Sequence, residues 1–305
     1  MSRSTLSLVM VLTFLASLTY TNGVYALQGT ANPNSIEYWD GTDTYADLDA
    51  LLTDLGAADD DGYYHIKTAN QLHGVIRLSK SAVYKFKLDN DIYLNDVKSG
   101  DMENPNETSW SSKFNSWYKV TSYSKGFCGE LDGDGYTVYG LYSNGGYSGL
   151  IPVLMDGGSV HNLNIKNSYI RGTESGGGIV GFVKAHWKMA PVSVTYCTVD
   201  NVVIESTKKF VGGIIGGFGD IKITVSDCSV TRSKLKSTNE NPNLVSGIIG
   251  NGWGDSLVQK VTNCFTDSSV HPVTATTDKA SFDTIAAKVS YTNVYTSAKK
   301  NFAVD

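Results

Sequence analysis

The chain has 305 residues, of which 41% are hydrophobic and 18% charged, and its formal net charge at pH 7 is −5. This composition predicts a globular protein with a sizeable core, and the 31 Gly against 6 Pro argue against a Pro-rich disordered chain. No basic stripe is visible, so nucleic acid is not expected as a partner.

The N-terminus has the pattern of an export signal. Arg3 supplies a positive charge, residues 6–18 are largely apolar, and the sequence at 24–26 has the form of a cleavage site. A membrane anchor or a buried helix is the alternative, but the run is shorter than the roughly 20 residues that span a bilayer. We therefore predict a signal peptide at 1–26, with a mature protein that is secreted or held at the cell surface and meets the membrane only during export.

Residues 27–126 are predicted to form a lead-in and a small α/β cap. Apolar residues recur at helical spacing from 45 to 55, and Gly56 stands where that helix would end. Thr68 and Gln71 have the spacing of a capping box, which predicts the start of a second helix. Strands are expected at 63–66, 84–88 and 91–94, and a polar loop at 95–116.

The rest of the chain, 127–305, repeats itself. A Gly-Ile-Val/Ile-Gly element occurs three times, with starts 35 (213 − 178) and 34 (247 − 213) residues apart. A fixed period in this range indicates stacked structural units. The glycines of the element are Gly178 and Gly181, Gly213 and Gly216, and Gly247 and Gly250. We expect them to allow sharp bends where a side chain would collide with the neighbouring coil, while the branched residues between them pack inside.

A second ladder follows these elements. It runs through Cys197, Cys228 and Cys264, and we align Ser168 and Val294 with the same position. Small inward-facing core residues explain this pattern better than a metal or redox site, since no His or second Cys has zinc-motif spacing. No metal or cofactor is expected, although a disulfide between neighbouring copies remains open. Short strands separated by Gly, Asn, Asp and Ser turns then predict a parallel β-helix.

The order of several segments resembles that of secreted GLUG-motif repeat proteins. These segments are Trp39-Asp40-Gly41, residues 66–72, residues 89–94, residues 127–138 and the Gly-Ile-Ile-Gly copies. The resemblance covers most of residues 36–296 and implies a right-handed β-helix at the cell surface or outside it. Such repeats are found in adhesin-like proteins and in the non-catalytic part of some immunoglobulin A peptidases. The resemblance transfers no catalytic residue, and 284–287 lacks the glycines of the motif.

The sequence holds no recognisable catalytic motif. The five His are scattered, and neither an HExxH nor a Gly-x-Ser-x-Gly element occurs. Paired carboxylates for glycan cleavage exist at Asp132 with Asp134 and at Asp89 with Asp91, but each pair has the sequence context of a turn. A carbohydrate-active enzyme, either a polysaccharide lyase or a glycoside hydrolase with an acidic lateral groove, is therefore the alternative rather than the favoured function.

Aromatic side chains suggest where a ligand could bind. Trp187, with His186 beside it, and Trp253 both follow a Gly-Ile-x-Gly element by a few residues. Loops in register fall on one side of a solenoid, so the two Trp could form a sugar-stacking or protein-binding patch. Covering the edge of the core is the commoner role for such residues and is the alternative. We predict a non-catalytic scaffold for adhesion or ligand binding, with a glycan or a host or cell-surface protein as the partner.

Overall fold

The computed structural model describes residues 36–80, 84–185, 190–238, 245–252, 259–267, 271–272, 289–292 and 295–296. The predicted signal peptide at 1–26 and the first part of the lead-in lie outside these residues. In the described part of the chain, no helix is long and apolar enough to cross a membrane.

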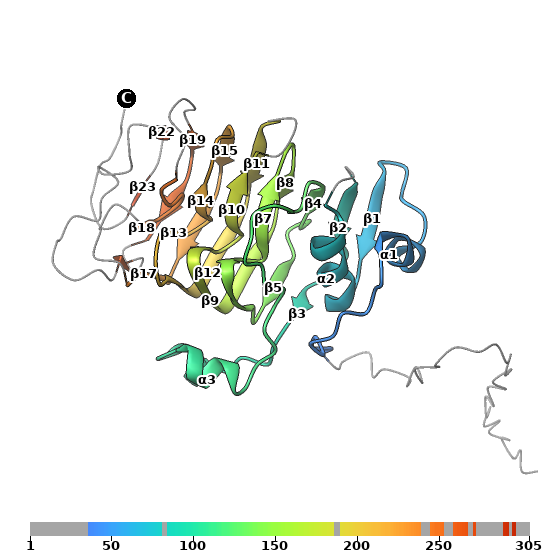
Figure 1. Ribbon diagram of the computed structural model, residues 1–305, viewed down its shortest axis with the longest axis horizontal. Helices are drawn as coiled ribbons and strands as arrows, with labels where there is room; N and C mark the ends of the chain where they lie inside the picture. Colours follow the sequence, from blue (N-terminus) through green and yellow to red (C-terminus); the bar gives the residue numbers. More distant parts are fainter. Residues whose placement is uncertain are drawn as a thin grey trace, which may run out of the picture. The chain divides into compact units, whose positions relative to one another are not determined.

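Three parallel sheets carry the described strands, and neighbouring strands in each sheet come from successive coils of the chain (Figure 1). The first sheet has eight strands, in the spatial order β1 (Tyr63–Ile66), β2 (Lys85–Leu88), β4 (Glu130–Asp132), β8 (Ser159–His161), β11 (Val192–Thr195), β15 (Ile223–Ser226), β19 (Gln259–Thr262) and β22 (Val289–Thr292). The second sheet has three strands, in the order β7 (Ile151–Met155), β10 (Val180–Lys184) and β14 (Ile215–Phe218). We call them the eight-stranded and the three-stranded sheet.

The third, twelve-stranded sheet contains β3 (Ile92–Tyr93), β5 (Thr137–Tyr139), β6 (Tyr142–Ser148), β9 (Asn164–Gly177), β12 (Thr198–Ser206), β13 (Phe210–Gly212), β16 (Ser229–Thr231), β17 (Lys234–Ser237), β18 (Val245–Ser246), β20 (Phe265–Thr266), β21 (His271–Pro272) and β23 (Tyr295–Thr296). The chain thus visits the sheets in turn and returns to each one coil later. This is the predicted parallel β-helix, and the mainly-β class is confirmed.

The N-terminal helices form as their sequence signals predict. α1 (Leu48–Leu55) ends at Gly56, whose φ of 81° lies in the left-handed region that favours glycine. α2 (Ala69–Leu78) begins with the predicted capping box: the Thr68 hydroxyl accepts the Gln71 amide, and the Gln71 side chain accepts the Thr68 amide. Apolar residues from both helices join the hydrophobic core that continues through the coils.

The eight-stranded sheet passes through the predicted boundary at 126/127 without a break. β2 pairs in parallel with β1 on one side and with β4 on the other, and β4 pairs with β8. The strands of the predicted cap are therefore the first rungs of the solenoid, although their connections are helical. Figure 1 shows β1, β2 and β4 leading into the later strands of the same sheet.

The predicted loop at 95–116 contains two short helices instead. η1 (Ser99–Met102) is a 3₁₀ turn, and α3 (Glu107–Ser111) begins at Asn106, whose side chain accepts the Ser109 amide. Trp110 explains why this segment is folded, because its side chain is buried against Tyr142 and Tyr169. These two tyrosines lie on neighbouring strands and stack on each other. One aromatic anchor thus folds a polar segment whose local pattern predicted no structure.

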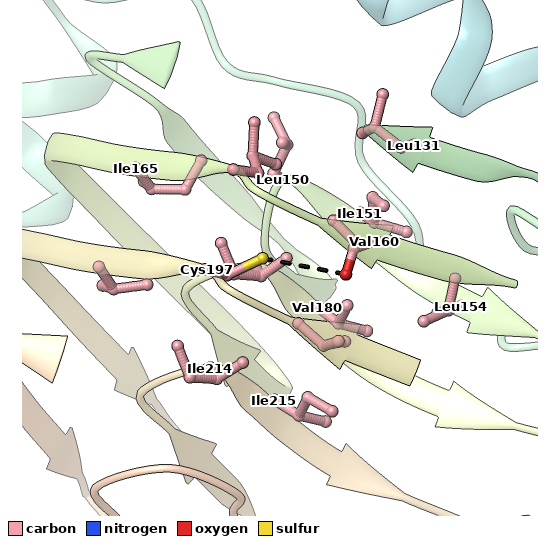
Figure 2. Packing of buried hydrophobic residues seen from close by; sticks show 14 of the residues in the cluster. Leu131, Leu150, Ile151, Leu154, Val160, Ile165, Val180, Cys197, Ile214 and Ile215 are labelled. Carbon is pink, nitrogen blue, oxygen red and sulfur yellow. Dashed lines mark hydrogen bonds between the residues drawn. The ribbon is translucent and has the colours of Figure 1, made fainter. Parts of the chain in front are cut away.

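The Gly-Ile-x-Gly elements lie in the predicted register. Ile215 pairs with Val180 on one side and with Ile249 on the other. The intervening residues, including Ile214, are fully buried, and Figure 2 shows them packed with residues from several coils.

The glycines are required by the closeness of the next coil. A Cβ on Gly178 would lie 2.4 Å from the Gly213 carbonyl oxygen, and one on Gly213 would lie 2.1 Å from that of Gly247. At the other end of the element, a Cβ on Gly216 or Gly250 would meet the carbonyl of the preceding copy's glycine, Gly181 or Gly216 respectively, at 2.5 and 1.9 Å.

The cysteine ladder is also confirmed, with one correction to its register. Cys197, Cys228 and Cys264 are buried and free, and they occupy equivalent positions because Thr198 pairs with Ser229 and Ser229 with Phe265. Each thiol donates to the carbonyl two residues before it, at 3.2–3.3 Å. Figure 2 also shows the longer contact, 3.9 Å, from Cys197 Sγ to the Val160 oxygen.

The alignment of Ser168 with this ladder is wrong. Asn164 pairs with Thr198, which places Leu163 level with Cys197, whereas Ser168 pairs with Val202. The strand equivalent to the one before Cys197 is β8, where Val160 pairs with Val194, so the prediction aligned a run of β9 after the corner with strands that precede the corner. Val294 lies outside the described residues.

Candidate functional site

The binding residues that the sequence suggested cannot be placed. His186, Trp187 and Trp253 all lie outside the described residues, so their proposed patch stays a prediction. In the described part of the chain, the fold brings other polar groups together.

The outward face of the first rungs of the eight-stranded sheet gathers titratable side chains. Strand alternation sends Phe86, Leu131 and Val160 inward, where all three are fully buried. Their neighbours in each strand point outward, and the register aligns them in two ladders. The resulting N-terminal polar cluster consists of Tyr63, His65, Lys85, Lys87, Glu130, Asp132 and His161.

His161 stands between two carboxylates. Its Nε2 atom lies 3.1 Å from Glu130 Oε1, and its Nδ1 atom lies 3.3 Å from Asp132 Oδ1. The side-chain amide of Asn162 donates a hydrogen bond to Asp132 Oδ1 at 3.1 Å. The His161 imidazole thus lies between the Glu130 and Asp132 carboxylates.

Tyr63 and two lysines close the cluster on its other side. The Tyr63 hydroxyl donates to Glu130. The Lys85 and Lys87 ammonium groups lie 5.1 and 5.0 Å from the centre of the Tyr63 ring, within the range of cation–π attraction. Lys87 also approaches Asp132, with 3.9 Å between Nζ and Oδ2.

These contacts set the pKa of Glu130. Partial burial is the largest single influence and by itself raises the pKa, but the hydrogen bonds from Tyr63 and His161 and the charge of His161 outweigh it, so the net pKa of Glu130 is lowered. The same hydrogen bond, together with burial, raises the pKa of Tyr63. At neutral pH the carboxyl group is thus ionised and the phenol protonated.

A second histidine pair lies next to the cluster. His65 Nδ1 is 2.5 Å from Asp89 Oδ1, and Nε2 is 3.0 Å from Asp59 Oδ2. The hydrogen bond to Asp89 raises the pKa of His65. Asp89 is therefore occupied by His65 rather than coupled to Asp91, whose carboxylate accepts the Thr137 amide at 2.8 Å.

The other carboxylate pair from the sequence has the predicted turn geometry. Asp132 Oδ1 accepts the backbone amide of Asp134 at 2.8 Å, and Asp134 has a positive φ of 48°. The turn interpretation of this pair is confirmed, but it missed that Asp132 also contacts His161. His161 seemed isolated because its partners are about 30 residues away in sequence and one coil away in space. The sequence signal that could have predicted this contact is that outward-facing residues occupy equivalent positions in successive strands.

A cavity of about 220 Å³ lies beside α3. Its lining includes Asp101, Asn106, Trp110 and Lys113. The Asp101 carboxylate is already paired with Lys113 at 2.6 Å. Since binding pockets for small molecules are usually 300–1,000 Å³ and mostly apolar, this small polar cavity is a weak candidate.

Metal-ligating groups do not converge in the described residues, where no three His, Cys, Asp or Glu side chains are placed to hold an ion.

Comparison with known proteins gives little beyond the fold. No family model and no curated protein matches the chain, so the resemblance to GLUG-motif proteins stays a prediction. Among solved structures, the chain is similar to one described as a "putative immunoglobulin A1 protease" from Bacteroides ovatus, with 15% sequence identity, a TM-score of 0.46 and 82% of each chain covered. At this identity and TM-score the likeness carries no argument about activity.

Proposed function

We propose that this protein is a secreted or cell-surface, non-catalytic β-helix scaffold that binds a glycan or a surface protein, and that its repeats are of the GLUG type. The export pattern at 1–26 supports the location. The observation that carries the non-catalytic part of the proposal is that the side chains of the N-terminal polar cluster are already paired with one another.

An acid–base catalyst for glycan cleavage needs a carboxyl group that is still protonated near its working pH. In the described residues, every carboxyl group with a shifted pKa is shifted downward: Asp40, Asp59, Asp96, Asp101, Glu130, Glu174 and Asp200. Glu130 is further held by Tyr63 and His161. The cluster therefore has the properties of a rigid ion-pair surface.

A carbohydrate-active enzyme is the second candidate, and one observation favours it. Glu130, Asp132 and His161 are the kind of groups that such enzymes use, and they share one outward face. A ligand that displaced His161 from between the carboxylates would free both of them. This is the specific event that the enzyme would require.

Binding without turnover distinguishes the two candidates. The secreted chain would be screened against a glycan array and a panel of host and cell-surface proteins, and each bound polysaccharide would then be incubated with the protein and analysed for shorter products. The scaffold predicts at least one ligand with saturable binding and no products. The Glu130→Gln and His161→Asn variants should bind with unchanged affinity.

The enzyme would instead release oligosaccharide products, and Glu130→Gln would abolish them. Product formation by the wild type that is lost in this variant overturns the non-catalytic assignment. A chain that binds nothing in either screen overturns the proposed function as a whole.

A further inference from the structure

A tyrosine occupies an unusual place at the corner between β11 and β12. Tyr196 has a φ of 55°. The equivalent corner residues on the neighbouring coils are Asn162, Asp227 and Asn263, with φ between 53° and 56°. Asn and Asp tolerate this left-handed conformation because their short side chains can hydrogen-bond locally, whereas a bulky side chain has no such compensation.

The tyrosine gains no burial from this conformation. Its relative exposure is 60%, the highest among the exposed large hydrophobic residues of the described chain. An exposed aromatic ring in a costly backbone conformation, at a position where the other coils use Asn or Asp, is explained neither by core packing nor by turn chemistry. Such outliers cluster at ligand-binding sites.

A second exposed aromatic lies along the same corner. Phe265, with an exposure of 38%, begins β20 two residues after Asn263. It is aligned with Thr198 and Ser229 on the outward face of the preceding coils. Tyr196 and Phe265 come from coils two rungs apart, so they are separated by about 10 Å along the stack, at about 4.8 Å per rung.

Polar residues occupy the equivalent corner and strand positions of the neighbouring coils. The Asn263 amide donates to Asp227 Oδ1 at 3.1 Å, which holds the carboxylate in place. The hydroxyl groups of Thr198 and Ser229 lie on the adjacent outward ladder. We call this set the corner strip: Tyr196, Thr198, Asp227, Ser229, Asn263 and Phe265.

The composition of the corner strip favours a sugar over a protein. A protein interface needs about 800 Å² on each partner and an apolar centre. Here two separate rings are divided by a carboxylate, an amide and hydroxyl groups, so no contiguous apolar patch forms. A sugar chain presents apolar C–H faces to aromatic rings and hydroxyl donors to carboxylate and amide oxygens. Because the one charge in the strip is negative, a neutral chain suits it better than an acidic one.

We propose that the corner strip binds a neutral, unbranched polysaccharide that lies along the solenoid axis, with one sugar ring stacked on Tyr196 and another on Phe265. This inference rests on the proposed function, since it names the ligand class of the scaffold. The strip begins one coil after Asn162, which contacts Asp132 of the N-terminal polar cluster, and it runs from there along the later coils.

The decisive variant is Tyr196→Asn, which gives this corner the residue found one coil earlier. Since Asn is better suited to the left-handed conformation, the variant should fold with an equal or higher Tm. The probes are β-1,4-linked hexasaccharides of glucose, mannose and N-acetylglucosamine, titrated by calorimetry against the secreted chain. We expect one of them to bind the wild type and Tyr196→Asn to raise its Kd at least tenfold. Phe265→Thr should raise it as well.

Tyr38→Asn is the matched control, because it removes an exposed tyrosine from the first rungs of the solenoid and should leave the Kd unchanged. Wild-type affinity in Tyr196→Asn would overturn the corner strip while leaving the scaffold function intact. Binding only of acidic glycans, or only of a protein, would overturn the proposed ligand class. An absence of any ligand in the full screen would remove both proposals.

Discussion

The buried thiols of the cysteine ladder illustrate how one residue type is adapted to the core. The pKa of Cys264 is raised by its hydrogen bond to Cys228 and then by burial, and that of Cys228 is raised by its hydrogen bond to Cys197. Thiols held in this way are neutral at physiological pH, and since the thiolate is the nucleophile, they should be inert in the folded protein.

Alkylation tests this expectation. We expect Cys197, Cys228 and Cys264 to resist iodoacetamide in the folded protein and to be labelled fully once denaturant is added without reductant, as read by mass spectrometry. Cys128, which is also buried and has a raised pKa, serves as the internal control outside the ladder. Protection that survives denaturation and is lost only on reduction would show disulfides and contradict the free-thiol ladder.

His65 should make the stability of the protein depend on pH. Its pKa is raised by the hydrogen bond to Asp89, so its contribution is fully present below the unfolded value of about 6.5 and is lost as the pH rises through the higher folded value. His65→Gln should therefore lower Tm at pH 5.5 by a few degrees at most, because the pair is partly exposed, and have less effect near pH 9.

The control for His65 is Lys67→Gln, which removes a weaker partner of the same Asp89 without titrating in this range. Thermal unfolding curves of both variants and the wild type across this pH range provide the measurement. An effect of His65→Gln that grows as the pH rises would mean that the sign of the pKa shift is wrong.

At the scale of the element, the Gly-Ile-x-Gly copies depend on a contact between backbones. A methyl group on Gly213 would stand 2.1 Å from the Gly247 oxygen and 2.6 Å from a Val230 methyl carbon. Neither the carbonyl nor the buried valine can move without separating the coils. We expect Gly213→Ala to cost more than about 2 kcal/mol of unfolding free energy.

Gly100→Ala is the matched control, since a Cβ there would meet nothing within 4 Å. Its effect should be within about 0.5 kcal/mol. Denaturant melts followed by circular dichroism compare the two variants. If both changes cost the same, the close approach of the coils at Gly213 is not what selects glycine.

At the scale of the whole molecule, the continuous eight-stranded sheet predicts one cooperative unfolding transition for the part of the chain that the structure describes. The first rungs and the later coils share a core, from Leu72 of α2 to Cys264. A separate N-terminal domain, as the boundary at 126/127 implied, would unfold with its own midpoint.

Two probes separate these possibilities. Trp39, Trp110 and Trp117 are buried in the N-terminal part, so in a variant with Trp187→Phe and Trp253→Phe all tryptophan fluorescence comes from that part. Circular dichroism reports mainly the β-structure of the coils. We expect both signals to change at the same denaturant concentration, and two distinct midpoints would contradict the shared core.

The architecture could be predicted from the sequence, because repetition is a local and periodic signal. The spacing of the glycine elements, the three cysteines and the capping box at Thr68 each predicted a feature that the structure contains. Where two apolar runs flank one corner, the same reasoning failed: Ser168 was placed in the cysteine ladder because the run in β9 after the corner was aligned with strands that lie before it.

Which polar groups meet could not be predicted from the sequence and became visible in the folded chain. Tyr63, Glu130 and His161 are up to 98 residues apart (161 − 63) in the sequence, and they converge because stacking brings equivalent outward positions within about 4.8 Å per rung. The strained geometry of Tyr196 is likewise invisible in a sequence, since a corner residue reveals its φ only once its coil is aligned with its neighbours. The periodicity of the sequence determines the coil, whereas the contacts between coils determine which side chains meet on the surface.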